Sequence, residues 1–109
     1  MDSRLLWGTV DTLILELIAA GPTYGYQIAQ SIIEKSHGSF EITEGSLYPA
    51  LHRLERKKFL ASFWQEADGR ERKYYKLTPA GRAALAARRK EWKTFSAGVQ
   101  AILGEAGAS

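Results

Sequence analysis

Cysteine is absent from the 109-residue sequence, so the chain forms no disulfide and has no thiol chemistry. Histidine occurs only twice, and no HExxH-like spacing suggests a metal site. Long apolar runs are missing too, since none approaches the roughly 18 residues of a membrane span. Asp11 and Glu16 interrupt the apolar N-terminal stretch, which we interpret as a helix of the mature protein. We therefore expect no metal, no cofactor and no membrane partner.

Enzyme motifs are equally scarce. No glycine-rich phosphate loop follows a strand, and no GxSxG elbow is present. The composition is that of an ordinary globular protein, with 45% hydrophobic and 25% charged residues. The length suits one domain with a modest core. These features favour a binding protein over an enzyme.

Positive charge is concentrated in the second half of the chain. The formal net charge is +3, but residues 1–52 carry a net −4, residues 53–76 a net +4 and residues 77–109 a net +3. A local basic patch is the usual footprint of a polyanion partner such as nucleic acid. The alternative is a solvated surface that happens to be basic, and charge alone does not separate the two.

Apolar periodicity predicts two helices before residue 40. The first has an apolar face made of Leu6, Val10, Leu13, Ile14, Leu17 and Ile18. Gly21-Pro22 ends it, because proline cannot continue the ladder. Thr23 is a predicted N-cap for the second helix. The apolar face of that helix holds Tyr26, Ala29, Ile32 and Ile33. Gly25 indicates a loose helix start or the close approach of another backbone, and Phe40–Ile42 is a candidate strand.

The next segments predict a helix, a hairpin and a longer helix. Thr43 caps a helix to about Lys58, with Leu47, Leu51 and Leu54 on one face. Strands at 59–66 and 70–77 flank the turn signal Ala67-Asp68-Gly69. Thr78 and Pro79 then start a helix that runs to about Leu103.

This element order predicts an α+β, mostly α fold: a winged helix-turn-helix with a long C-terminal helix. We divide the chain into a DNA-binding domain at 1–78, a dimerisation helix at 79–103 and a flexible tail at 104–109. A helix of about 10–12 Å diameter fits the major groove, and a basic hairpin can reach the adjacent backbone or minor groove. The alternative is a winged helix that serves only as a protein-interaction module. Such a module need not concentrate basic residues on the third helix and the hairpin.

Three sequence blocks resemble the PadR-like transcriptional regulators. They are GPTYGY at 21–26, EGSLYPALHRLE at 44–55 and RKYYKLTPAG at 72–81, in the family's order and spacing. The single C-terminal helix is similar to that of the shorter PadR subfamily. The resemblance implies cytoplasmic homodimers that repress promoters at pseudo-palindromic operators in double-stranded DNA. It also implies release by a small aromatic or cationic effector.

Carried over position by position, the resemblance places ten residues at DNA. These are Tyr24, Ser46, Tyr48, Pro49, His52, Arg53, Arg70, Arg72, Lys73 and Tyr75. Those at 46–53 would face the major groove, the three cations at 70–73 would form the wing, and the other two tyrosines would lie near phosphates. The chemistry of the side chains agrees, since cations neutralise phosphates and hydroxyls position the protein.

Several of these side chains have plainer interpretations. Tyr48 packs against the wing in one alternative, with only its hydroxyl in water. His52 is equally compatible with an ordinary surface histidine. Arg53, by contrast, is compatible with a functional role, a bidentate contact to guanine. The cations at 56–58 fit a solvated helix end that favours the helix dipole.

The last helix carries an apolar stripe that predicts a homodimer. Its seven-residue spacings resemble coiled-coil positions, and a lone helix cannot bury such a stripe. The predicted interface comprises Leu6, Trp7, Leu85, Trp92, Phe95, Val99 and Ile102. Trp92 matches a position where some multidrug-binding PadR relatives hold flat compounds between paired tryptophans, which implies effector binding. The alternative is a tryptophan packed in the dimer core.

Overall fold

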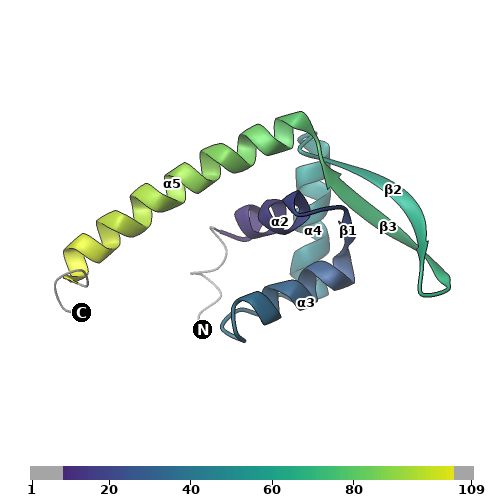
Figure 1. Cartoon of the computed structure of the whole chain (residues 1–109), viewed down its shortest axis with the longest axis horizontal. Helices are drawn as coiled ribbons and strands as arrows, with labels where there is room; N and C mark the ends of the chain where they lie inside the picture. Colours follow the sequence, from purple (N-terminus) through teal and green to yellow (C-terminus); the bar gives the residue numbers. More distant parts are fainter. Residues whose placement is uncertain (1–8, 105–109) are drawn as a thin grey trace.

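Helices make up most of the structure, a computed structural model that describes residues 9–104 (Figure 1). The elements in chain order are α2 (Val10–Ala19), β1 (Thr23–Tyr24), α3 (Gly25–Lys35), α4 (Glu44–Arg56), β2 (Leu60–Ala67), β3 (Arg70–Leu77) and α5 (Pro79–Leu103). This confirms the α+β, mostly α, winged helix-turn-helix order with its long C-terminal helix. The predicted interface residues Leu6 and Trp7, and the predicted tail from 105 onward, lie outside the described residues.

The sheet contains a strand, β1, that the sequence does not predict. β1 pairs antiparallel with β3, and β3 pairs with β2, so the strand order is β1-β3-β2. Thr23, predicted as an N-cap, lies in β1 opposite Tyr75, and Tyr24 is the N-cap of α3. A strand of two residues is too short to show the alternation by which strands are found in a sequence.

Asp68 and Gly69 form the hairpin turn between β2 and β3. Their φ angles are 55° and 77°, as a two-residue type I′ turn requires. Ala67, predicted within the turn, pairs with Arg70 as the last rung of the ladder. The positive φ of both turn residues suits the right-handed twist of the strands. The hairpin extends well beyond the helices (Figure 1).

The core lies where α2, α3, α4 and the base of the hairpin meet. Leu47, Leu51 and Leu54 of α4 are fully buried, as predicted. Leu15 is also fully buried, although it is off the predicted face of α2, because α2 packs against α3, α4, α5 and β3. In α3 the prediction was wrong by a fraction of a turn: Ile28 is fully buried, whereas Tyr26 is 55% exposed.

Phe40–Ile42 is not the predicted strand. The segment is irregular, and Ile42 fills the core as a loop residue. Ser36 accounts for its course: the hydroxyl accepts the Phe40 N–H at 3.0 Å and turns the chain back after α3. Within residues 9–104, no helix is both long enough and apolar enough to cross a bilayer.

α5 is attached to the winged part through its first turns. The Thr78 hydroxyl accepts the Gly81 N–H at 3.0 Å and donates to the Lys58 carbonyl at 2.6 Å. A Cβ on Gly81 would lie 2.1 Å from the Phe59 carbonyl oxygen, so only glycine lets α5 come this close. Further along, Arg89 donates to the Glu16 carboxylate at 2.6 Å, and the helix then projects away from the other elements (Figure 1).

Candidate nucleic-acid interface

α4 presents one exposed stripe and two flanks. Pro49, His52 and Arg56 lie three and four residues apart on the side opposite the buried leucines, and all three are exposed. Pro49 leaves α4 continuous, since it lies near the start on the solvent side. Sequence reasoning left Arg56 out of the site, although its spacing from His52 places it on this stripe.

Tyr48 occupies the flank of α4 that faces α3. A Cβ on Gly25 would lie 2.6 Å from the Tyr48 hydroxyl oxygen, so the tyrosine ring rests on the bare backbone at the start of α3. The close approach expected at Gly25 is therefore real, but a side chain makes it. Tyr48 remains 40% exposed, which leaves part of the ring at the surface beside the exposed stripe.

Arg53 and Ser46 lie on the opposite flank of α4, toward α2. The guanidinium of Arg53 donates to Asp11 at 2.8 Å, and the side chains are 47% and 15% exposed, respectively. Arginine has five N–H donors, so this contact leaves donors for another ligand. Asp11 thus fixes the direction in which Arg53 points.

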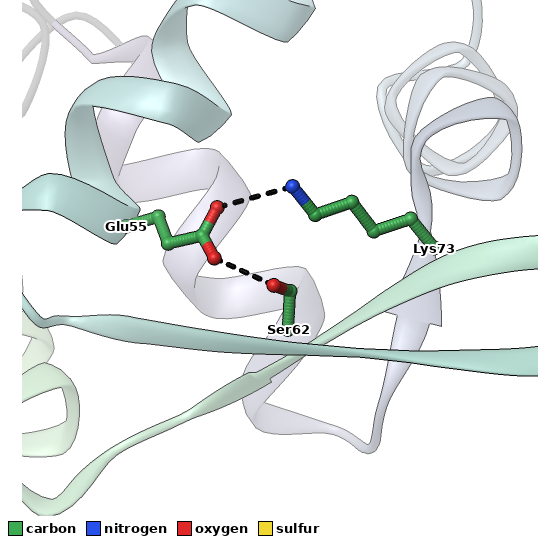
Figure 2. A network of polar contacts seen from close by, with 3 residues as sticks. All are labelled: Glu55, Ser62 and Lys73. Carbon is green, nitrogen blue, oxygen red and sulfur yellow. Dashed lines mark hydrogen bonds and ion pairs between the residues drawn. The ribbon is translucent and has the colours of Figure 1, made fainter.

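Glu55 connects α4 to both strands of the hairpin (Figure 2). Its carboxylate accepts the Ser62 hydroxyl of β2 at 2.5 Å and lies 3.4 Å from the Lys73 ammonium of β3. The Ser62 hydrogen bond, followed by the charge of Lys73, lowers the pKa of Glu55 below its ordinary value. The sequence did not indicate this contact, because nothing in the spacing of residues 55, 62 and 73 shows that they meet.

The cations of β3 point to two different faces of the sheet. Side chains alternate along a strand, so Arg70, Arg72 and Lys76 share one face, which we call the outer face. Lys73 lies on the opposite, inner face. The three predicted wing cations are therefore divided.

Aromatic side chains organise the outer face. The guanidinium of Arg72 lies 4.6 Å from the centroid of the Tyr24 ring, and the ammonium of Lys76 lies 5.9 Å from that of Phe63. Tyr74 packs between the two rings, with centroid distances of 5.2 Å to Tyr24 and 5.6 Å to Phe63. These contacts pack the two cations over aromatic rings, and the Nε atom of Arg72 is buried with no hydrogen-bond partner among the described residues.

Tyr75 does not lie at the surface as predicted. It is 3% exposed and packs in the core on the inner face, where burial raises the pKa of its hydroxyl. Tyr24 is partly buried beneath Arg72. The alternation of β3 explains the difference, because Tyr75 shares its face with the buried Leu77.

The apolar stripe of α5 is exposed over most of its length. Trp92, Phe95, Val99 and Ile102 are 49%, 63%, 39% and 88% exposed, respectively. The rings of Trp92 and Phe95 lie 5.9 Å apart. Leu85, predicted at the same interface, is 4% exposed because it packs into the core of its own chain. Leu85 therefore anchors α5 and is not available to a partner.

Comparison with known proteins identifies the family. Residues 14–87 match the family model described as "Transcriptional regulator PadR-like family". A transcriptional regulator of Mycobacterium tuberculosis is 43% identical over 72 residues, which span 66% of this chain and 64% of that protein.

Solved structures show the same fold. A transcriptional regulator from Clostridium thermocellum is similar with a TM-score of 0.84 and 33% identity, over 92% of this chain and 95% of that one. A PadR family regulator from Clostridium difficile is similar with a TM-score of 0.78 and 32% identity, over 87% and 98%. With its winged helix and the matched family region, the chain belongs to the PadR-like family of DNA-binding transcriptional regulators.

Proposed function

We propose that this chain is a homodimeric repressor that binds a pseudo-palindromic operator. The observation that carries the proposal is the exposed apolar stripe of α5, in which Trp92, Phe95, Val99 and Ile102 stand at the surface of a single chain. A second copy supplies a matching stripe by symmetry. Two copies present two α4 helices, which suit half-sites about 34 Å, or a multiple of that, apart.

Each copy would contact DNA with two surfaces. The exposed stripe and flanks of α4 would enter the major groove, with Ser46, Tyr48, Pro49, His52 and Arg53 as the sequence predicts and Arg56 added. Arg70 and Arg72 of the outer face would neutralise phosphates beside the groove. Repression follows if the operator overlaps a promoter, because the bound dimer excludes the polymerase.

Trp92 would bind the effector at the dimer centre. It is 49% exposed and lies beside Phe95, so two copies would bring four aromatic rings together around the symmetry axis. Flat aromatic or cationic compounds stack well on such rings. In a Trp7→Phe, Trp64→Phe variant, quenching of the remaining Trp92 fluorescence by planar compounds is expected. Unchanged fluorescence across the panel would assign Trp92 to the dimer core instead.

Selection of bound duplexes from random DNA tests the operator directly. The expected result is an inverted repeat whose half-site spacing reflects the dimer. Replacing Arg70 and Arg72 together by alanine should weaken binding to every duplex and lower the salt slope by about two. A protein that shifts neither random nor selected DNA would favour the alternative, a winged helix used only for protein interactions.

A further inference from the structure

Glu55 is the side chain that joins α4 to the hairpin. One carboxylate oxygen accepts from Ser62 of β2 and the other faces Lys73 of β3, so a single residue reaches both strands (Figure 2). Within residues 9–104, no other side-chain hydrogen bond connects α4 itself with β2 or β3. The pairing of β1 with β3 and the buried Tyr75 also hold the base of the hairpin, and its outer end extends away from the helices (Figure 1).

Lys73 forms the other half of this contact and is partly buried by it. Its ammonium lies 3.4 Å from the Glu55 carboxylate and 5.5 Å from the centroid of the Tyr75 ring, and its side chain is 32% exposed. The carboxylate compensates its charge locally. Arg70 and Arg72, on the other face of the strand, have no carboxylate partner among the described residues. Lys73 is therefore the wing cation whose charge is compensated by a carboxylate among the described residues.

We propose that Glu55 is a positioning residue that holds the wing at one angle to α4, and that Lys73 serves this attachment rather than a DNA phosphate. The proposal rests on the proposed function, in which α4 and the wing bind one duplex together. Rigid spacing between the two contacts favours DNA whose groove geometry matches it. Without the attachment, the wing can adjust its angle to many different duplexes. The preference for the selected duplex over other sequences then falls, while the affinity for DNA in general is kept.

Substitution of Glu55 by alanine tests the proposal. Two affinities are measured across a range of salt concentrations: for the duplex selected by the wild-type protein and for a scrambled duplex. The ratio of the two is expected to fall about tenfold, the equivalent of about 1.4 kcal/mol. The salt slope is expected to rise by up to about one, because released Lys73 gains access to a phosphate. Glu66→Ala is the matched control: it removes the same charge from the inner face of β2, where Glu66 faces Glu71 instead of a cation.

Conservative variants separate positioning from a loss of fold. Glu55→Gln keeps an acceptor for Ser62 but no charge for Lys73, and an intermediate ratio is expected. Lys73→Met leaves the sequence of α4 unchanged, so this variant tests the proposal even if Glu55→Ala does not fold. It should lower the ratio and leave the salt slope unchanged, whereas Arg72→Ala should lower the slope by about one.

Two results would overturn this inference without affecting the proposed function. One is a Lys73→Met protein whose salt slope falls as far as that of Arg72→Ala, since Lys73 would then contact a phosphate. The other is a folded Glu55→Ala protein that loses affinity for both duplexes equally. Wild-type protein that binds neither duplex would instead overturn the proposed function, and this inference with it.

Discussion

Two glycines show how a single missing Cβ shapes this molecule. Gly25 lets the ring of Tyr48 lie against the start of α3, and Gly81 lets α5 lie against the Phe59 carbonyl. The two neighbours differ in how they can respond. Tyr48 is a partly exposed side chain that can swing toward solvent, whereas Phe59 contributes backbone that is already bonded to Thr78.

The two alanine substitutions should therefore have unequal effects. Gly81→Ala is expected to cost about 2–3 kcal/mol of unfolding free energy, because backbone must move apart. Gly25→Ala is expected to change stability by less than about 1 kcal/mol, since the gain in helix propensity offsets the displaced ring. It should still weaken DNA binding by moving Tyr48. Urea unfolding and a mobility shift measure both, and equal destabilisation by the two changes would contradict this account.

Two carboxylates link stability to pH. The hydrogen bond from Arg89 lowers the pKa of Glu16, and the hydrogen bond from Ser62 lowers that of Glu55, both from an ordinary 4.5. A lowered folded-state pKa contributes stability above the ordinary value that is lost as the pH falls below it. Both groups are partly exposed, so each contribution should stay below about 1 kcal/mol. Urea unfolding between pH 6 and about pH 3 should show a smaller loss in Glu16→Gln and Glu55→Gln than in the wild type.

At the scale of elements, the hairpin contains an unfavourable pair. Glu66 and Glu71 lie directly opposite each other near the tip, on the inner face. Like charges at such positions destabilise a ladder, and opposite charges stabilise it, by about 0.2–1 kcal/mol. The sequence does not show this pair as such, because it depends on the register that the Asp68-Gly69 turn sets.

Glu71→Lys should accordingly stabilise the protein by about 0.5 kcal/mol. Thermal unfolding at low salt measures the change, which should shrink as salt screens the pair. The double variant Glu66→Lys, Glu71→Lys restores a like-charge pair and serves as the control. If the single and double variants were equally stabilised, the gain would come from β propensity and not from charge.

The elements could be predicted from the sequence where the pattern is long and one-sided. The start of α4 and both ends of α5 are predicted correctly, whereas α4 ends at Arg56, two residues before the predicted Lys58. β1 was missed because it is too short to show alternation. The predicted face of α3 is wrong because it includes Tyr26 as an apolar residue, although this side chain lies at the surface.

The site could be predicted only to the level of its elements. Exposed positions on α4 follow from helical spacing, and Arg56 could have been found in the same way. The division of the wing cations depends on which strand face packs on the core, and the buried Tyr75 reveals that only in three dimensions. The partners of Arg53, Lys73 and Arg89 lie 42, 18 and 73 residues away in the chain, beyond the reach of local patterns.

At the scale of the whole molecule, the apolar stripe of α5 is the surface through which we propose that two copies assemble. Ile102→Glu places a charge where the proposed dimer buries an apolar side chain, while Ile102 is 88% exposed in the single chain. The variant should keep its thermal unfolding at low concentration but sediment as a monomer. Lys93→Glu, an exposed change on the same helix, is the control. A dimer that persists in Ile102→Glu would place the interface elsewhere.

The same helix is long enough to act as a lever arm. Its Arg89 forms an ion pair with Glu16 of the winged part, and about 21 Å of helix follow before Leu103 at 1.5 Å per residue. A tilt of about 10° at that pivot would move the far end by about 4 Å over this length. In the proposed dimer, in which the C-terminal parts of the two α5 helices meet, a small rearrangement near the pivot would therefore produce a larger change in the distance between the two α4 helices.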